Sequence, residues 1–224
     1  MKAFIEWLSD LLKQFFAHVE TIDQVDPIEK EIGELRIGLI VGHEKSAQGA
    51  VMPAPYRLSE YAYNSEIAQL AKDYAKRIGV TAEIIFRDGI GISGAYKKAK
   101  SLGVDCVIEL HFNAFNGTVS GTETLCSNEG ADKQFANFVH NHVCNVFDRK
   151  PGAGDRGVKT LSATDRGGSN VHALPNIPNC LIEGFFGDNP KEAKMALERK
   201  EQYAHALIDA CVEWANSRMQ VNLA

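Results

Sequence analysis

Two histidines and a glutamate each follow a largely apolar run of this chain. Residues 39–42 lead to His43, residues 107–110 lead to His111, and residues 178–182 lead to Glu183. Such runs are typical of buried strands, and in open α/β sheets ligands bind at the carboxyl ends of the strands. Imidazole and carboxylate groups together suit Zn²⁺. The three runs therefore predict a metal-hydrolase site at one edge of a sheet.

A third metal ligand is expected from a rigid element close to the two histidines. Glu60 stands at the start of a predicted helix, directly after the loop 44–58. Its carboxylate is either a ligand or only a favourable charge at the helix N-terminus, and spacing alone leaves both interpretations open. With Glu60 as a ligand, His43, His111 and a water would complete the four-coordinate pattern of catalytic zinc.

Glu183 is predicted to act as a general base. It ends an almost wholly apolar strand, where partial desolvation favours the protonated carboxyl and raises its pKa. A carboxylate beside a metal-activated water can take a proton during the attack and pass it to the leaving group. The alternative is a structural ion pair with Arg156 or Lys159.

From residue 35 onward, apolar strand patterns alternate with amphipathic helix patterns. This alternation predicts an α/β fold with a mostly parallel sheet between layers of helices. Ser59 is expected to cap the first helix, and Asn189-Pro190 to begin the last one. Strands are predicted at 35–42, 82–87, 104–112, 121–126, 156–161 and 178–184, helices at 59–78, 93–102, 130–147 and 190–216, and glycine-rich surface loops at 88–94, 152–157 and 167–168.

The other histidines are interpreted as ordinary core or loop residues. His140 and His142 lie two residues apart on a predicted helix, so they point to different faces and cannot chelate one ion together. The remaining three are His18, His172 and His205.

The composition is that of an ordinary globular protein. The chain has 224 residues, 45% hydrophobic and 24% charged, which suits one large α/β domain with an appendage. No apolar run is long enough to span a membrane, and charged residues interrupt any signal-peptide core near the N-terminus. The five cysteines are widely spaced, which predicts reduced, buried thiols.

The net charge lies entirely in the first segment, residues 1–34. Three lysines and eight carboxylates there account for the whole net charge of −5. Because no basic face is apparent, nucleic acid is not expected as a partner. Apolar residues at helical spacing predict an amphipathic helix over 3–20, followed by an acidic connector over 21–34. Soluble monomers avoid an exposed stripe of this kind, so we expect docking on the domain 35–224 or in a homodimer.

Five motifs, in this order, resemble one known family. They are Gly-His at the end of a strand, Glu at the start of a helix, His-x-Asn-Ala, Arg-Gly-Val-Lys in a loop, and Pro-x-x-Leu-x-Glu-x-x-Phe. The corresponding residues are Gly42-His43, Glu60, 111–114, 156–159 and 178–186. From about 36 to 218 the chain thus resembles the zinc-dependent N-acetylmuramoyl-L-alanine amidases, which include bacterial autolysins and phage endolysins.

The resemblance implies a site and a reaction. One Zn²⁺ per chain would be bound by His43, Glu60 and His111, which selects Glu60 over Glu66, and Glu183 would be the catalytic carboxylate. The implied fold is a twisted mixed sheet flanked by helices on both faces. The implied substrate is peptidoglycan, and a zinc-activated water would cleave the amide between N-acetylmuramic acid and L-alanine.

Residues around the predicted site are expected to support it. Asn113 is a candidate for orienting a ligand or contacting the substrate, and Arg57 and Arg156 are further candidates for substrate contact. The chain departs from many relatives in having Glu44-Lys45 where they have Gly-Gly after the first histidine. The loop 44–58 is therefore expected to be specific to this protein.

Two other functions remain open from the sequence. The chain could be a zinc amidohydrolase or peptidase that acts on a different amide, or a non-catalytic wall-binding protein. In the amidase interpretation we expect it to be made in the cytoplasm without a signal peptide. It would then reach the wall as a released phage lysin or by non-classical export, and the sequence does not separate a phage lysin from a bacterial autolysin.

Overall fold

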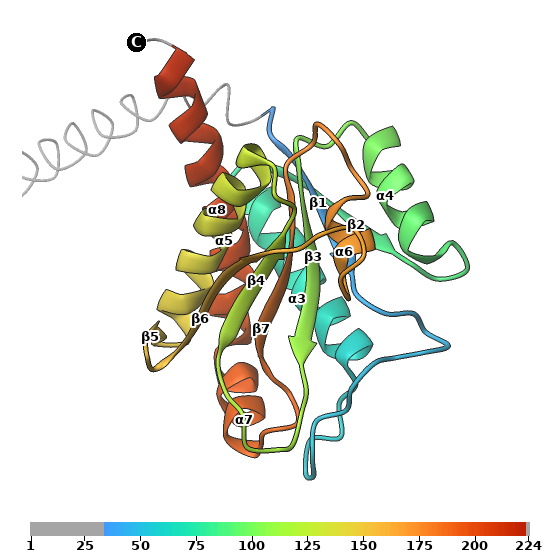
Figure 1. Ribbon diagram of the computed structural model, residues 1–224, viewed down its shortest axis with the longest axis vertical. Coiled ribbons are helices and arrows are strands. Elements are labelled where there is room, and N and C mark those ends of the chain that lie inside the picture. The colour runs from blue at the N-terminus through green and yellow to red at the C-terminus, as the bar shows by residue number, and fades with distance from the viewer. Residues whose placement is uncertain (1–33, 223–224) are drawn as a thin grey trace, which may run out of the picture.

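The computed structural model describes residues 34–222, with side chains described as far as residue 218. Its strands form one mixed sheet in the order β2-β1-β3-β7-β4-β6-β5 (Figure 1). Neighbouring strands are parallel except β4 and β7, which are antiparallel. The strands are β1 (Arg36–Val41), β2 (Thr81–Phe86), β3 (Cys106–Asn113), β4 (Thr122–Cys126), β5 (Lys150–Pro151), β6 (Gly154–Thr160) and β7 (Asn179–Phe186).

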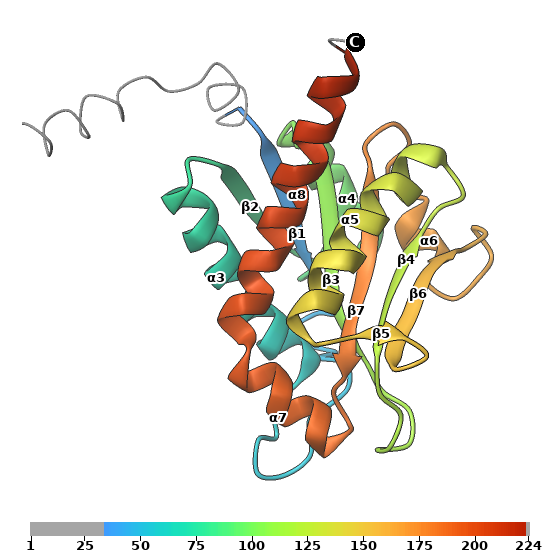
Figure 2. The same ribbon diagram turned by 90° about the vertical axis from the view of Figure 1, so that its left-hand side faces the viewer.

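Helices cover both faces of the sheet, as Figure 2 shows. Helices α3, α5 and α8 lie on one face, and α4 and α6 lie on the other. The helices are α3 (Glu60–Arg77), α4 (Gly91–Ser101), α5 (Gly130–Val146), α6 (Gly168–Val171), α7 (Pro190–Glu198) and α8 (Lys200–Asn222). The predicted α/β fold, with a mostly parallel sheet between helical layers, is confirmed.

Strands β1 and β3 are apolar along nearly their whole length because they are buried on both faces. Successive side chains alternate between the two faces. Leu39 and Ile108 join the larger core under α3, α5 and α8, whereas Ile40 and Val107 join a smaller core under α4. The smaller core leaves part of its face of the sheet uncovered, and the candidate site opens there.

Capping residues fix where two of the helices begin. The Ser59 side chain accepts a hydrogen bond from the Ala62 amide, so α3 starts with Glu60 in its first turn. Asn189 accepts from the Lys191 amide, with proline at the first helical position of α7. Both predicted starts are confirmed.

Several boundaries differ from the predictions. The helix predicted at 190–216 is two helices, α7 and α8, which are separated at Arg199. The Arg199 guanidinium donates to the Val146 carbonyl at 2.6 Å and so fastens the break to the end of α5.

The prediction of a surface loop at 152–157 was partly wrong, because β6 begins at Gly154 and contains the Arg-Gly-Val-Lys motif. Gly91 likewise begins α4, and neither β5 nor α6 was predicted.

The predicted helix 3–20 and nearly all of the acidic connector lie outside the described residues. Docking of that helix on the domain or in a dimer therefore stays a prediction. Within residues 34–222, no helix combines the length and the apolar character needed to cross a membrane.

Candidate active site

A close approach between β1 and β3 brings the two predicted histidines together. A Cβ atom at Gly42 would lie 2.4 Å from the Leu110 carbonyl oxygen and 2.5 Å from the His111 ring, so only glycine fits here. His43 follows with a φ of 66°, in the left-handed region that non-glycine residues seldom adopt. Such backbone strain costs about 1–3 kcal/mol and is concentrated at functional sites. The tight turn ends β1 and leaves the two imidazole rings 5.1 Å apart between centroids.

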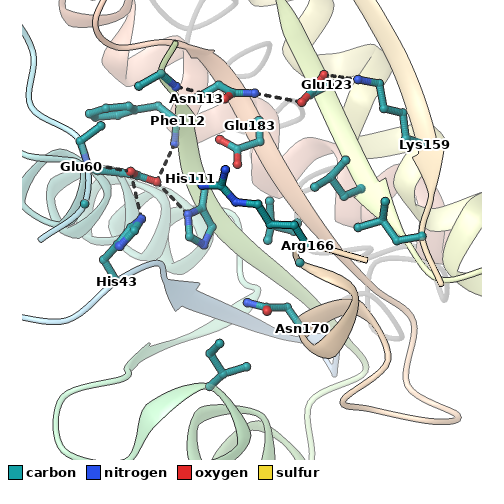
Figure 3. Close-up of a pocket in the computed structure, with 18 of the residues that line it drawn as sticks. His43, Glu60, His111, Phe112, Asn113, Glu123, Lys159, Arg166, Asn170 and Glu183 are labelled. Carbon is teal, nitrogen blue, oxygen red and sulfur yellow. Dashed lines mark hydrogen bonds and ion pairs between the residues drawn. The ribbon is translucent and has the colours of Figure 1, made fainter. Parts of the chain in front are cut away.

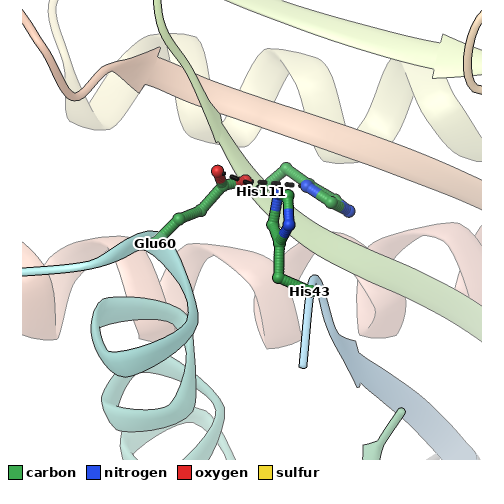
Figure 4. Close-up of side chains that lie close together, drawn as sticks. All are labelled: His43, Glu60 and His111. Atoms are coloured by element: carbon green, nitrogen blue, oxygen red, sulfur yellow. Dashed lines mark hydrogen bonds and ion pairs between the residues drawn. The ribbon is translucent and has the colours of Figure 1, made fainter. Parts of the chain in front are cut away.

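The Glu60 carboxylate points at both of these histidines (Figure 4). Its Oε2 is 3.0 Å from His43 Nε2, and its Oε1 is 2.7 Å from His111 Nδ1. One nitrogen or oxygen atom from each of the three residues lies within 4.8 Å of the others. The structure thus brings together the three predicted metal ligands, from the end of β1, the start of α3 and the end of β3.

A bulge in β3 helps to hold the Glu60 carboxylate. The pairing of β3 with β7 shifts register between His111 and Asn113, and the Phe112 amide donates to Glu60 Oε1 at 3.1 Å. The Ala50 amide donates to Oε2 at 3.3 Å. Burial raises the pKa of Glu60, but hydrogen bonds from His111 and His43 outweigh it and lower the pKa to about 2. The carboxylate is therefore held charged and oriented.

Glu109 supports His111 from the opposite side of the imidazole ring. It is fully buried, and its Oε1 is 3.2 Å from His111 Nε2. Arg87, Tyr96 and Asn170 also donate to it, at 3.0, 2.7 and 2.7 Å. Burial raises its pKa, yet these partners, His111 first, lower it to about 2.

The His111 ring accordingly has a carboxylate at each nitrogen. Burial lowers the pKa of His111, but hydrogen bonds to Glu109 and Glu60 raise it to about 10. The cluster therefore stabilises positive charge at this point of the fold.

Glu183 lies in the middle of a row across three strands. Its register partners are His111 on β3 and Glu123 on β4. The residue lines a cavity and is only partly buried, yet its Oε2 is buried and has no hydrogen-bond partner in the described part of the chain. Burial raises its pKa, His111 lowers it and neighbouring carboxylates raise it, with a net result of about 8. Strand β7 continues to Phe186, so Glu183 is not at the very end of its strand.

The cations expected as alternative partners of Glu183 pair with Glu123 instead. Arg156 Nε donates to Glu123 Oε2 at 2.8 Å, and Lys159 forms an ion pair with the same oxygen. The Asn113 side-chain amide donates to Glu123 Oε1 at 2.9 Å. Glu123 thus takes up these three donors, and Glu183 is left without a salt bridge among residues 34–218.

A cavity of about 740 Å³ joins these groups (Figure 3). Both Glu183 and the cluster of His43, Glu60 and His111 line it. Arg166, which is exposed, and Lys159 bring positive charge to its wall. Of the predicted substrate contacts, Asn113 lines the cavity, whereas Arg57 and Arg156 are not among the lining residues.

A family model for N-acetylmuramoyl-L-alanine amidases matches residues 37–213. The chain belongs to this amidase family. It is accordingly a hydrolase of peptidoglycan, and the matched segment contains all four of the predicted catalytic and metal-binding residues. Comparison with individual curated protein sequences gives no significant match.

Solved structures of amidase catalytic domains have the same fold. The catalytic domain of CwlV from Bacillus (Paenibacillus) polymyxa is 21% identical, with a TM-score of 0.67 over 81% of this chain and 98% of that one. The catalytic domain of an endolysin targeting Clostridia difficile is 24% identical, with a TM-score of 0.63 over 80% and 98%. Ami1 from Mycobacterium smegmatis is 18% identical, with a TM-score of 0.67 over 83% and 99%.

Three groups in or directly behind the amidase cavity are not recognised from the sequence pattern. Glu109 was treated as part of an apolar strand, although a residue two positions before His111 must share its face of the sheet. Glu123 pairs with Glu183 only because β4 lies antiparallel beside β7, which no local pattern reveals. Arg166 comes from a glycine-rich segment that has no periodicity to place it.

Proposed function

We propose that this amidase binds one catalytic Zn²⁺ through His43, Glu60 and His111. We further propose that it cleaves the amide between N-acetylmuramic acid and L-alanine, with Glu183 as general base. The proposal rests on the Oε2 of Glu183, which has no hydrogen-bond partner among the described residues, while Glu183 lines the same cavity as the three ligands. Metal-assisted amide hydrolysis requires a set of metal ligands and, beside it, a carboxyl group that is free to take up a proton.

The residues of the cluster fit a zinc ion. Two imidazole nitrogens and one carboxylate oxygen are a common donor set of catalytic zinc sites. The space between them is kept open, because a Cβ atom at Gly49 would lie 2.6 Å from Glu60 Oε2 and 2.7 Å from His43 Nε2. When bound, Zn²⁺ would polarise the amide carbonyl and acidify a water.

Glu183 would move the proton in this reaction. Its free Oε2 can accept a proton from the attacking water, and the resulting carboxyl can return it to the leaving nitrogen of L-alanine. A pKa of about 8 in the metal-free protein leaves a minority of this carboxyl charged at neutral pH, and the positive charge of a bound metal would enlarge that charged fraction.

Other side chains would orient the metal ligands and the substrate. Glu109 would fix the His111 ring through Nε2 and leave Nδ1 for the metal, which is a common outer-shell arrangement. Asn113 lines the cavity and is held by Glu123, so it can offer a fixed amide to the substrate. Arg156 would act indirectly, by holding Glu123 through its hydrogen bond. Arg57 is exposed, and we propose that it contacts the glycan at the protein surface.

The test is cleavage of purified muropeptide by the full-length chain, followed by mass spectrometry of the products. We expect a free lactyl carboxylate on the glycan and a new L-alanine amino group. His111→Ala should lose activity and one zinc equivalent, whereas His205→Ala, a histidine on α8 remote from the cluster, should keep both. Unchanged zinc in His111→Ala would refute the ligand assignment.

The same assay separates the two rival functions. Cleavage of unrelated peptides in preference to muropeptide would indicate a different amide substrate. Binding to cell walls without any cleavage, at full zinc occupancy, would indicate a non-catalytic protein.

A further inference from the structure

A second group of metal-ligand side chains lies on the opposite face of the sheet from the cavity. His140 and Cys144 come from α5 and are buried, and Asp155 comes from β6. His140 Nε2 is 2.9 Å from Asp155 Oδ1 and 3.4 Å from Cys144 Sγ. One nitrogen, sulfur or oxygen atom from each lies within 4.8 Å of the other two.

The two nitrogens of His140 have different surroundings. Nδ1 is 3.0 Å from the Thr124 hydroxyl, which fixes the orientation of the ring. Nε2 faces both Cys144 and Asp155, although one ring nitrogen has a single hydrogen or a single lone pair to offer. A cation between the three groups would satisfy all of them, with the Nδ1 hydrogen bond to Thr124 as the outer contact typical of metal-bound histidine.

The spacing of the donors suits a tetrahedral ion. His140 and Cys144 are four residues apart, so they share one face of α5. Ligands of tetrahedral zinc, at roughly 2.0–2.3 Å from the metal, are separated from one another by about 3.5 Å. The side chain of Asp155 is 24% exposed, so solvent can deliver an ion and supply a fourth ligand.

The surrounding charge does not oppose a cation. Arg149 is the cation that acts on the Cys144 thiol, and it is neutralised by an ion pair with Glu192 at 2.6 Å. Burial, together with the charge of Asp155, raises the pKa of Cys144 to about 12, so the thiol is protonated without metal and metal binding would have to displace its proton.

We propose that His140, Cys144 and Asp155 bind a Zn²⁺-class ion that is distinct from the catalytic one. The ion would fasten β6 to α5, and it would thereby steady the strand that carries Arg156 and Lys159 beside the cavity. Because none of its ligands belongs to the catalytic cluster, the proposal stands or falls independently of the proposed function.

Cobalt substitution of the full-length protein tests this site. The catalytic cluster contains no sulfur, so a thiolate-to-cobalt charge-transfer band in the near ultraviolet can come only from a cysteine site. We expect the band in the wild type and in His111→Ala, and its loss in Cys144→Ser. Cys126→Ser is the matched control, because Cys126 is equally buried on β4, and it should keep the band.

The number of zinc ions bound per chain is the second measurement. Asp155→Asn is a milder substitution that can be used if Cys144→Ser does not fold. Loaded wild type should hold one zinc ion per chain more than Asp155→Asn does. In the His111→Ala background, Asp155→Asn should also abolish the rise in melting temperature on zinc addition. The proposal is overturned if cobalt-saturated wild type shows no thiolate band. It is also overturned if Asp155→Asn holds as many zinc ions as wild type, or if the band depends on Cys126 rather than Cys144.

Discussion

Glu109 and Glu183 are two carboxylates on adjacent strands, and they differ in their hydrogen bonds and in the charges around them. Both lie near His111, and burial raises the pKa of each. Glu109 has four hydrogen-bond partners and a pKa lowered to about 2, whereas the buried oxygen of Glu183 has no partner in the described chain and its pKa is about 8. Hydrogen bonds and the signs of the neighbouring charges, rather than burial, therefore decide which carboxylate is charged.

This difference separates two tasks at one site, with Glu183 at the cavity wall and Glu109 buried behind His111. A fully bonded carboxylate such as Glu109 is rigid and permanently negative, which suits it to orient a metal-binding histidine. A carboxyl without partners can gain and lose a proton without breaking a network, which suits Glu183 to general acid and base catalysis. Exchanging either side chain for glutamine should thus have different consequences.

The largest effect is expected from Glu183→Gln. Glutamine cannot accept the proton, so the cleavage rate on muropeptide should fall by about 10²–10⁴-fold. Zinc content should stay unchanged at neutral pH. The melting temperature should match that of wild type only near pH 4.5 or below, where the carboxyl is protonated in the folded protein and largely so in the unfolded chain. Retention of most of the wild-type rate would show that Glu183 is not the base.

A smaller effect is expected from Glu109→Gln. Glutamine keeps the shape but loses the charge that holds the Nε2 proton of His111, and outer-shell changes of this kind typically cost about 10–100-fold in metal affinity or activity. Zinc affinity measured by chelator competition should fall accordingly, while Glu183→Gln serves as the variant with unchanged affinity. If activity falls but zinc affinity does not, Glu109 does not act through the metal.

The order of elements and most site residues could be predicted from the sequence because they depend on local patterns. Apolar runs indicate β1, β3 and β7. His43 follows the first of these strands, and His111 and Glu183 lie toward the carboxyl ends of the other two. The parallel arrangement then requires strand ends to meet at one edge. Selection of Glu60 needed the family resemblance, because a first-turn glutamate has a second ordinary explanation.

The remaining features depend on contacts that no local pattern encodes. The antiparallel insertion of β4 between β7 and β6 puts Glu123 next to Glu183 and draws Arg156 and Lys159 away from it. The break at Arg199 depends on a hydrogen bond to the end of α5, far away in the sequence. Asp155 joins His140 in the same way, across the gap between β6 and α5.

The two carboxylates should also differ in how they make the stability of the metal-free protein depend on pH. A carboxyl whose pKa rises from 4.5 to about 8 on folding binds a proton in the folded state that the unfolded chain releases. Its contribution is fully present below pH 4.5 and is lost as the pH rises through 8. Wild type should therefore melt at nearly the same temperature as Glu183→Gln at pH 5, and several degrees below it at pH 9.

Glu109→Gln provides the opposite pattern in the same experiment. The pKa of Glu109 is lowered to about 2, so its contribution is complete above the unfolded value of 4.5 and is lost only as the pH falls toward 2. The melting-temperature difference between Glu109→Gln and wild type should thus be constant from pH 5 to about 6.5, below the range in which His111, whose pKa Glu109 raises, begins to lose its proton on unfolding. A constant difference for Glu183→Gln as well would mean that Glu183 is already charged at pH 5. The two carboxylates would then not differ in charge at neutral pH, which would contradict the role of Glu183 as the proton carrier.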